Sequence, residues 1–552
     1  MSLRSRYKPA LSLVELAVLV AGMALYLGLT SYQLHLPGPH YDEAIEVLPT
    51  MQFLLGQPVE AFRGAGLHIG SLFLPLMTMD YIGAMNTYLA LPFLALLGVT
   101  VPAMRLMPIL FSAITLLLTY ALARDLFGRA GAAIAYLTLA GSVSFVFWSR
   151  QGIFVTNLTA TLMMGALVCA LRWRRSGRRR CLWAAAFLLG LGLYTKFIFL
   201  WAIGALAGSV ILLYADQWVA WARRRAGRPW PALSQHDALG AVAAFLLPLV
   251  PLIIFNLQTG GTLRALTANM RQSYYGVNNL AFWENLQTRA DQLRSVLEGS
   301  HFWYLGETFA NQLWPPALAG ALALLIAVAL WRRRTIGDAW RAALFPFAMI
   351  GIILLESCFT ISALWYTHFA ILTPLPPLAL AGALTFIARQ SGKARLLAPA
   401  MVVLVAGLIA YDVQADVRYH TVLQASGGYA AHSDASYELA RVLQREAAGP
   451  VVALDWGIQA QTQYLTAGQI APQEVFGYDD LAQPDAGFAA RLAPYLRDSR
   501  TLYVAHPSDQ EVYRGRALSF NRIAEQAGKT VRIYHIIYER SGRPAYIVLK
   551  AD

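Results

Sequence analysis

Residues 101–140, "VPAMRLMPILFSAITLLLTYALARDLFGRAGAAIAYLTLA", are the stretch that decides the fold. They carry one apolar run at 105–123 and the start of a second at 130–147, joined by the short link "ARDLFGR" (123–129). About 20 apolar residues cross a bilayer as a helix, because a helix satisfies all its backbone N–H and C=O groups internally. We therefore predict two membrane-spanning helices joined by an arginine-containing link.

The composition extends this prediction to the whole chain. Of the 552 residues 57% are hydrophobic and only 14% are charged, whereas soluble domains are nearer one quarter charged. We therefore predict an all-α polytopic membrane bundle of about eleven transmembrane helices. The predicted spans are 11–31, 105–123, 130–147, 155–171, 181–196, 197–214, 238–256, 313–331, 343–363, 368–387 and 396–411.

The distribution of arginine predicts the topology. The net charge of +13 comes from short basic clusters between apolar runs, so we set nucleic acid aside as a partner. The apolar segment 84–98 is short and contains Pro92. If segment 84–98 does not cross the membrane, all basic links lie on the cytoplasmic side. This agrees with the known preference of Lys and Arg for cytoplasmic loops. These links are 123–129, 172–180, 223–228, 332–334 and 389–395, together with Arg4, Arg6 and Lys8.

This topology predicts a multi-pass protein of the plasma (inner) membrane that consists of two domains. Residues 1–411 form the transmembrane domain, with outer loops at 32–104 and 257–312. Residues 412–552 form a small extracytoplasmic α/β domain, with strands expected at "PVVALD" (450–455), "TLYVAH" (501–506), "TVRIYHIIY" (530–538) and "PAYIVLK" (544–550).

The outer loop at 257–312 contains one pattern typical of a helix. In "NNLAFWENLQTRADQLRSVLEG" (278–299), Phe282, Leu286, Leu293 and Leu297 recur at helical spacing. We predict a helix over the site, acting either as a lid or as a plain packing helix.

The outer face collects five ionisable residues that indicate a site. Asp42 and Glu43 follow the first span, Arg150 ends "FWSR", Lys196 separates two apolar runs, and His368 ends "WYTH". Each has a simpler interpretation: acids favour a helix N-terminus, arginine reaches lipid headgroups, and His368 can belong to an interfacial aromatic belt. Lys196 is the hardest to explain this way, because an ionisable group at the edge of the apolar layer is costly.

Together these residues suit a lipid-phosphate substrate. Arginine makes two-pronged contacts with phosphate and lysine provides a point charge. An aspartate can accept the proton of a hydroxyl. Cys169, Cys181 and Cys358 have no zinc-site spacing and offer no disulfide framework.

Four stretches resemble the GT-C glycosyltransferases, in particular bacterial relatives of the protein O-mannosyltransferases and the lipid A aminoarabinose transferase. These are "HYDEAIEVLPTMQFLLGQP" (40–58), the stretch 101–140, "VFWSRQGIFVTNLTATLMM" (146–164) and "LGLGLYTKF" (189–197). A weaker similarity lies in "WYTHFAILTPLPPLALAGA" (365–383). The resemblance covers most of residues 1–390 and departs from the family pattern at Asn157, where relatives often carry Asp.

The resemblance implies an inverting membrane glycosyltransferase with a polyprenyl-phosphate-linked sugar donor, a hexosyl or pentosyl transferase. Asp42 would be the general base, and Glu43 would orient it, bind the acceptor or hold a divalent cation. Arg150, Lys196 and His368 would bind the donor phosphate. We assign no metal site and no required cofactor, because one carboxylate pair provides too few ligands to indicate a metal site.

Two other functions stay open at this point. A glycolipid transporter or flippase would move the same lipid without chemistry, although we find no internal repeat of the kind that transporters carry. A membrane receptor using the C-terminal domain would leave Lys196 unexplained. The sugar, and whether the acceptor is a glycan, a lipid or a protein, do not follow from the sequence, since few hydrogen bonds set such specificity.

Overall fold

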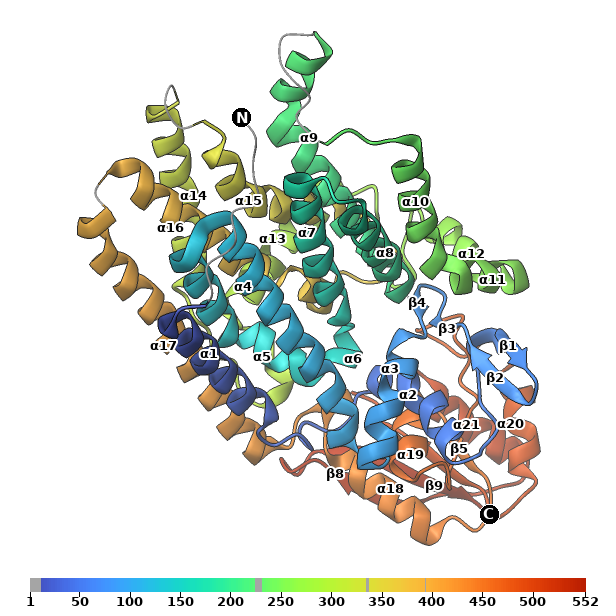
Figure 1. Cartoon of the computed structure of the whole chain (residues 1–552). Coiled ribbons are helices and arrows are strands. Elements are labelled where there is room, and N and C mark those ends of the chain that lie inside the picture. Colours follow the sequence, from blue (N-terminus) through green and yellow to red (C-terminus); the bar gives the residue numbers. More distant parts are fainter. Residues whose placement is uncertain (1–10, 224–230, 334–336, 393) are drawn as a thin grey trace.

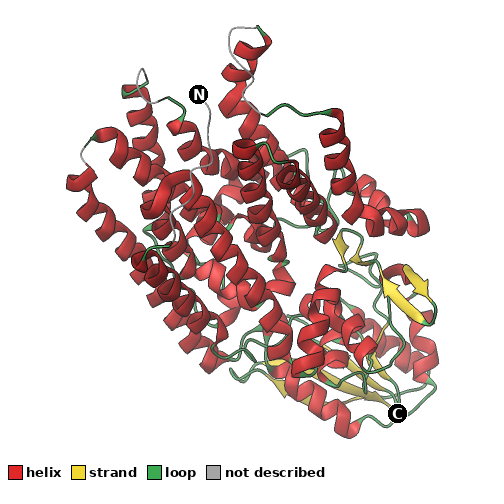
Figure 2. Cartoon of the chain, viewed as in Figure 1, coloured by secondary structure: helices red, strands yellow, loops and turns green. Residues whose placement is uncertain are grey.

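The computed structural model describes residues 11–223, 231–333, 337–392 and 394–552. A tall bundle of helices carries a mixed helix and strand layer at one end (Figures 1 and 2). Arg4, Arg6 and Lys8, and parts of the links 223–228 and 332–334, lie outside the described residues.

Within the described residues, seven helical segments are long and apolar enough to cross a membrane, and an eighth is a bent pair. The chain is therefore a multi-pass membrane protein. The seven are α1 (Leu13–Ser31), α4 (Val101–Ala140), η2 with α9 (Phe197–Ala222), α10 to α11 (Gln235–Thr259), α14 (Trp314–Trp331), α15 (Ala339–Glu356) and most of α17 (Ala394–Ser426). The bent pair joins η5 (Tyr366–Leu372) to α16 (Leu375–Ser391) at 45°.

Helix α4 contains a reversal that accounts for two predicted spans. Gly128 has φ +82°, a conformation open to glycine but strained for other residues. The rings of Tyr120 and Tyr136 are 5.6 Å apart, whereas 16 residues of straight helix would separate them by about 24 Å. The chain therefore turns back at Gly128 and pairs its two halves, as the sequence predicts for 105–123 and 130–147.

Two further helices, outside the seven named above, occupy the next predicted spans. These are α7 (Leu158–Ser176) and α8 (Arg179–Thr195). With these two helices and the second half of α4, each of the eleven predicted spans has a helical counterpart, while the crossing number itself stays a prediction. Helix α3 (Met85–Leu97) has 13 residues and rises about 20 Å, less than the ~30 Å of a hydrocarbon core. This length agrees with the prediction that 84–98 does not cross.

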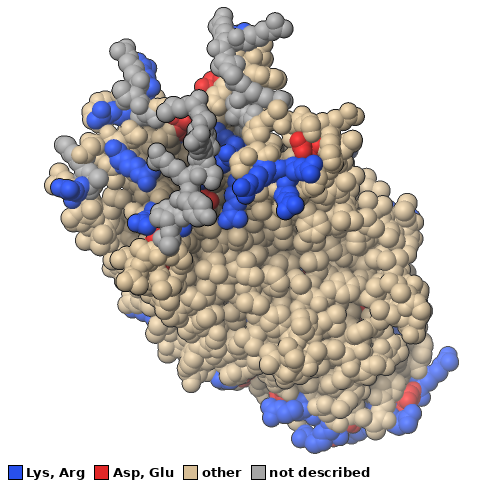
Figure 3. All heavy atoms as spheres, viewed as in Figure 1, with Lys and Arg blue, Asp and Glu red and all other residues tan. Residues whose placement is uncertain are grey.

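Charged residues collect at the two ends of the molecule, with a nearly uncharged belt between them (Figure 3). Arg174 and Arg175 lie in the last turn of α7, Arg332 caps α14, and Arg389 lies in the last turn of α16. These helix ends point away from the strand layer (Figure 1). The arrangement is the one that positive residues on a single membrane side would give.

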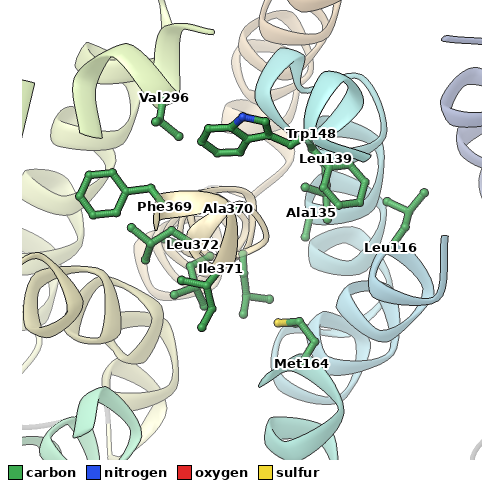
Figure 4. Packing of buried hydrophobic residues seen from close by; sticks show 14 of the residues in the cluster. Leu116, Ala135, Leu139, Trp148, Met164, Val296, Phe369, Ala370, Ile371 and Leu372 are labelled. Carbon is green, nitrogen blue, oxygen red and sulfur yellow. The ribbon is translucent and has the colours of Figure 1, made fainter. Parts of the chain in front are cut away.

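The bundle core is apolar and continuous. Figure 4 shows side chains from α4, α5 (Val143–Arg150), α7, α13 (Phe282–Glu298) and η5 directed into one interior. Trp148 and Phe369 are 2% or less exposed. At the arginine-bearing end, Glu15 accepts from Arg124 and Arg129 and from the Tyr120 hydroxyl, so this carboxylate joins helices.

The opposite end begins with the first outer loop. It contains α2 (Tyr41–Leu54), the hairpin β1 (Gly66–Ile69) and β2 (Leu72–Pro75), the pair β3 (Met77–Met79) and β4 (Ile82–Gly83), and α3. The loop between α11 (Val250–Thr259) and α14 adds α12 (Gly261–Ala268) and α13.

The C-terminal part is a five-stranded sheet of order β6-β5-β7-β9-β8. Strand β5 runs parallel to β6 and β7, while β9 is antiparallel to β7 and β8. The strands β5 (Val451–Ala453), β7 (Leu502–Ala505), β8 (Val531–Tyr538) and β9 (Pro544–Ala551) lie where the alternation predicts strands, and β6 (Gln473–Glu474) is too short for that signal. Helices α18 (Ala435–Glu446), α19 (Gln459–Leu465), α20 (Phe488–Leu496) and α21 (Arg516–Gln526) accompany the sheet.

Helix α17 continues past the predicted domain boundary at 411. Its Asp412 is buried and accepts hydrogen bonds from Asn311 and Trp314, so the helix remains part of the bundle to Ser426. The sheet part packs on the first outer loop, where the Tyr464 hydroxyl donates to Thr100 and the Tyr437 hydroxyl to His35.

Candidate active site

Helix α2 begins at the segment "LPGPHYDE" (36–43). His40 is the N-cap residue, and its Nδ1 accepts a hydrogen bond from the backbone N–H of Asp42. Asp42 and Glu43 therefore lie in the first turn, where the helix dipole favours carboxylates. The two are adjacent, yet the helix directs them to different sides.

Glu43 lies in a closed ion pair. It is 1% exposed, and Arg105 donates to it twice, from Nε at 3.0 Å and from Nη2 at 3.2 Å. Gln151 donates to the same carboxylate at 2.9 Å. Arg105 also donates to the carbonyls of Pro37 and Gly38. These bonds tie α2 to α4 and fix the entry to α2, so the structure gives Glu43 a structural role that the sequence did not reveal.

Asp42 is open by comparison. Its side chain is 29% exposed, and Nδ1 of the His40 imidazole lies 3.9 Å from its carboxylate. Burial lowers the pKa of His40 to about 3, so this neighbour is neutral and does not form an ion pair with Asp42. Burial of the rest of the Asp42 side chain and the charge of Glu43 raise its pKa, Lys196 opposes them, and the result is a pKa of about 6. A carboxylate of this kind is poised to accept a proton near neutral pH.

Glu46 is a site residue that the sequence analysis missed. It lies one turn after Asp42, on the same side of α2 because residues four apart share a helix face. It is 1% exposed, accepts a hydrogen bond from Asn86 at 2.7 Å, and has a pKa raised by burial. The i, i+4 spacing in "DEAIE" was the available signal.

Lys196 faces both carboxylates. It caps the C-terminus of α8, and its backbone forms a β-bridge with Ile82, while Phe197 donates to the carbonyl of Tyr81. The residue is 7% exposed, and among the described residues no carboxylate lies within 4 Å of its ammonium group. Its charge nevertheless acts on both Asp42 and Glu46. Asp42 and Lys196, which the sequence assigned to one site, therefore lie close enough for the charge of Lys196 to act on Asp42.

Arg150 lies in a different environment. It is 1% exposed and donates from Nη2 to the carbonyls of Gln33 at 2.8 Å and Leu36 at 3.0 Å. Its Nη1 lies 3.1 Å from Nδ1 of His420 on α17. The structure therefore uses Arg150 to hold residues 33–36, and a phosphate role for it stays an untested prediction.

His368 lies in η5 and is buried. Its Nδ1 is 3.4 Å from Nη2 of Arg289, and its Nε2 is 3.3 Å from the Ser362 hydroxyl. Arg289 on α13 is fully buried and donates to the carbonyls of Ser357 and Trp365. His368 lies on the Lys196 side of the molecule, where the charge of Lys196 acts on it. A phosphate role for His368 likewise remains a prediction.

Helix α13 forms where 278–299 predicts a helix, but its buried face differs. Its most buried side chains include Asn285, Arg289, Gln292 and Val296, while the predicted apolar stripe is only half-buried. The polar face is buried because its side chains donate hydrogen bonds to backbone carbonyl groups that are not paired within a helix. Asn285 donates to the carbonyl of Cys358, and Arg289 donates to the carbonyl of Ser357. A lid role for α13 stays a prediction.

No group of three or more His, Cys, Asp or Glu residues suited to a metal ion occurs within the described part of the chain. Asn157, where relatives often carry Asp, donates to the Ser112 hydroxyl inside the bundle.

Comparison with known proteins identifies the fold. Residues 83–255 match the family described as dolichyl-phosphate-mannose-protein mannosyltransferase. The crystal structure of ArnT from Cupriavidus metallidurans bound to undecaprenyl phosphate is similar at a TM-score of 0.59 and 12% identity, covering 97% of each chain. The chain therefore has a fold similar to that of ArnT, and its family match extends over residues 83–255.

A second solved structure is similar over the bundle. The archaeal oligosaccharyltransferase AglB from Archaeoglobus fulgidus, in complex with an inhibitory peptide and a dolichol-phosphate, has a TM-score of 0.52 at 12% identity. The match covers 90% of this chain and 69% of that one. No curated protein sequence matches the chain.

Proposed function

We propose that this protein is a GT-C glycosyltransferase that transfers a sugar from a polyprenyl-phosphate carrier to an acceptor hydroxyl, with inversion at the anomeric carbon. The observation that carries the proposal is an open carboxylate, Asp42, near a buried lysine, Lys196, that has no carboxylate within 4 Å in the part of the chain that the structure describes. The undecaprenyl phosphate bound to ArnT and the dolichol-phosphate bound to AglB, two proteins of this fold, support a lipid phosphate as the carrier.

The proposed reaction uses Asp42 as general base. The acceptor oxygen attacks the anomeric carbon while its proton passes to the Asp42 carboxylate. The bond between that carbon and the phosphate oxygen breaks, and its electron pair leaves with the lipid phosphate. Lys196 stabilises the negative charge that develops there.

Glu46 completes this arrangement as a positioning residue. Its carboxyl group is held by Asn86, and the charges of Glu46 and Lys196 act on each other. In this proposal that interaction orients the Lys196 side chain toward α2. In this proposal Glu43 and Arg105 hold the first turn of α2 rather than touching substrate.

We place the site and the C-terminal sheet on the extracytoplasmic side of an inner membrane crossed by eleven helices. The arginine-bearing helix ends support this orientation, because Lys and Arg concentrate on the cytoplasmic side. A cysteine at position 176 labelled by an impermeant reagent in intact cells would contradict it.

Release of the carrier tests the proposed function. Purified protein in detergent is mixed with polyprenyl-phosphate-linked sugars and with candidate acceptors that carry free hydroxyls, and free polyprenyl phosphate is measured by mass spectrometry. Wild type should release it and Asp42→Asn should not. A flippase would move the lipid between the leaflets of proteoliposomes without releasing phosphate, so transport without release would overturn the proposal.

A further inference from the structure

A cluster of tyrosines lies near the start of α2, where Asp42 is located. These tyrosines have no role in the proposed chemical step. The tyrosine cluster comprises Tyr41, Tyr274, Tyr275, Tyr478 and Tyr513. Its members come from three distant parts of the chain: the start of α2, the loop before α13, and the C-terminal sheet part.

Hydrogen bonds fix the cluster around one carboxylate. The Tyr41 hydroxyl donates to Oε1 of Glu474 at 2.9 Å, and the Tyr478 hydroxyl donates to Oε2 at 2.6 Å. The Tyr274 hydroxyl lies 2.8 Å from that of Tyr513 and donates to the Tyr478 carbonyl. Hydrogen bonds therefore hold four of the five phenol groups, while the ring of Tyr275 packs 5.0 Å from that of Tyr274.

The tyrosines of the loop are presented by a tight turn. Ser273 donates its backbone N–H to Val277, and Gly276 between them has φ +82°, which few other residues tolerate. Asn279 anchors the turn to the bundle by donating to the carbonyls of Asn269 and Thr360. Tyr275 is thus held in place although it is 45% exposed.

The cluster adjoins the proposed catalytic base. Tyr41 immediately precedes Asp42, and the ring of Trp456 from the C-terminal part lies 4.7 Å from that of Tyr41. The charge of Asp42 acts on Tyr275. Tyr274, Tyr275 and Tyr478 are each more than 40% exposed, so these side chains remain accessible to a ligand.

Rigid, exposed aromatic side chains beside hydrogen-bonding groups suit carbohydrate. A sugar ring has an apolar C–H face that packs on an aromatic ring, and its hydroxyls bond to phenols and carboxylates. Tyrosine offers both an apolar body and a polar tip in one side chain. A peptide acceptor fits less well, because the nearest sheet edge, β6, has only two residues to pair with an added strand.

We propose that the tyrosine cluster with Glu474 is a saccharide-binding site and that it places the hydroxyl of a glycan acceptor against Asp42. The role of the bound saccharide as acceptor rests on the proposed function. Saccharide binding itself does not depend on turnover. The C-terminal part would then select the acceptor, Asp42 would take its proton, and Lys196 would bind the donor phosphate.

The test is direct binding of free oligosaccharides to the full-length protein in detergent. Mannotetraose, maltotetraose and the tetramer of N-acetylglucosamine are titrated and followed by saturation-transfer NMR. At least one should bind wild type, and Tyr275→Ala and Tyr478→Ala should each weaken it about tenfold or more, as loss of an aromatic anchor does. Tyr275→Leu and Glu474→Gln extend the test should an alanine variant not fold.

Two controls separate the outcomes. Tyr538→Ala removes an exposed tyrosine on β8 outside the cluster and should bind as wild type does. Asp42→Asn should also keep saccharide binding while losing carrier release. Saccharide binding without carrier release by wild type would overturn the proposed function and keep this inference.

Two results would overturn the saccharide site. One is wild type that releases carrier yet binds none of the three oligosaccharides. The other is saccharide affinity that the cluster variants leave unchanged. Binding of a serine- and threonine-containing peptide library in place of the oligosaccharides would assign the surface to a protein acceptor instead.

Discussion

Asp42 and Glu43 are neighbours in sequence and opposites in environment. Glu43 is 1% exposed and meets Arg105, which is equally buried, in a two-pronged ion pair. The Asp42 side chain is 29% exposed and faces Lys196 across a gap wider than an ion pair. A closed pair has nothing left to offer a substrate, whereas separated charges can each take a new partner. The contrast teaches that openness, not residue type, separates the candidate base from a structural clamp.

The largest expected effect is on turnover. Asp42→Asn keeps the shape of the side chain but cannot accept a proton, so carrier release should fall about 10²- to 10⁴-fold. The apparent Tm should stay near that of wild type, because Asp42 forms no ion pair with a buried cation. Near-normal turnover by the folded variant would remove Asp42 from the mechanism.

Breaking the ion pair between Arg105 and Glu43 should affect stability rather than turnover. Arg105→Met leaves the buried Glu43 carboxylate without its cationic partner, which costs about 3–5 kcal/mol of unfolding free energy. Thermal unfolding in detergent measures it. Adding Glu43→Gln to Arg105→Met should recover part of the loss, because the second change removes the stranded charge. An Arg105→Met protein as stable as wild type would show that the pair is not a clamp.

The roles of the two cations, Lys196 and Arg150, can be distinguished by the same kind of comparison. Lys196→Ala should weaken binding of bare polyprenyl phosphate by about 1.5–3 kcal/mol, the worth of a hydrogen bond to a charged group. Arg150→Ala should lower the apparent Tm instead, because Arg150 holds the carbonyls of Gln33 and Leu36. Unchanged binding in Lys196→Ala, with loss in a folded Arg150→Ala, would reverse the two assignments.

The smallest expected effect is a shift in the pH profile. A base must be deprotonated to act, so kcat/KM should fall as pH drops through the Asp42 pKa of about 6, approaching tenfold per pH unit. The charge of Lys196 lowers this pKa, so in Lys196→Ala the fall should begin at higher pH. A pH–rate profile of both proteins measures the shift. Identical midpoints would show that Lys196 does not act on the base.

The sequence by itself determined the membrane class, the helix positions and the basic clusters in the links between spans. These follow from hydrophobic run length and from charge, which are local properties of the chain. It also determined Asp42 and Lys196 as site candidates, because an acid and a lysine beside apolar runs stand out against their surroundings. The reversal at Gly128 and four of the five C-terminal strands were likewise readable from local pattern.

Only the tertiary structure decided which charges are free. That Arg105 closes on Glu43 and Arg150 on residues 33–36 depends on contacts between residues more than 60 positions apart. The same holds for Arg289 beneath α13 and for Glu474 within the tyrosine cluster, neither of which has a local signature. Ion pairs and hydrogen bonds form wherever packing brings partners within about 3 Å, and sequence order does not record that proximity.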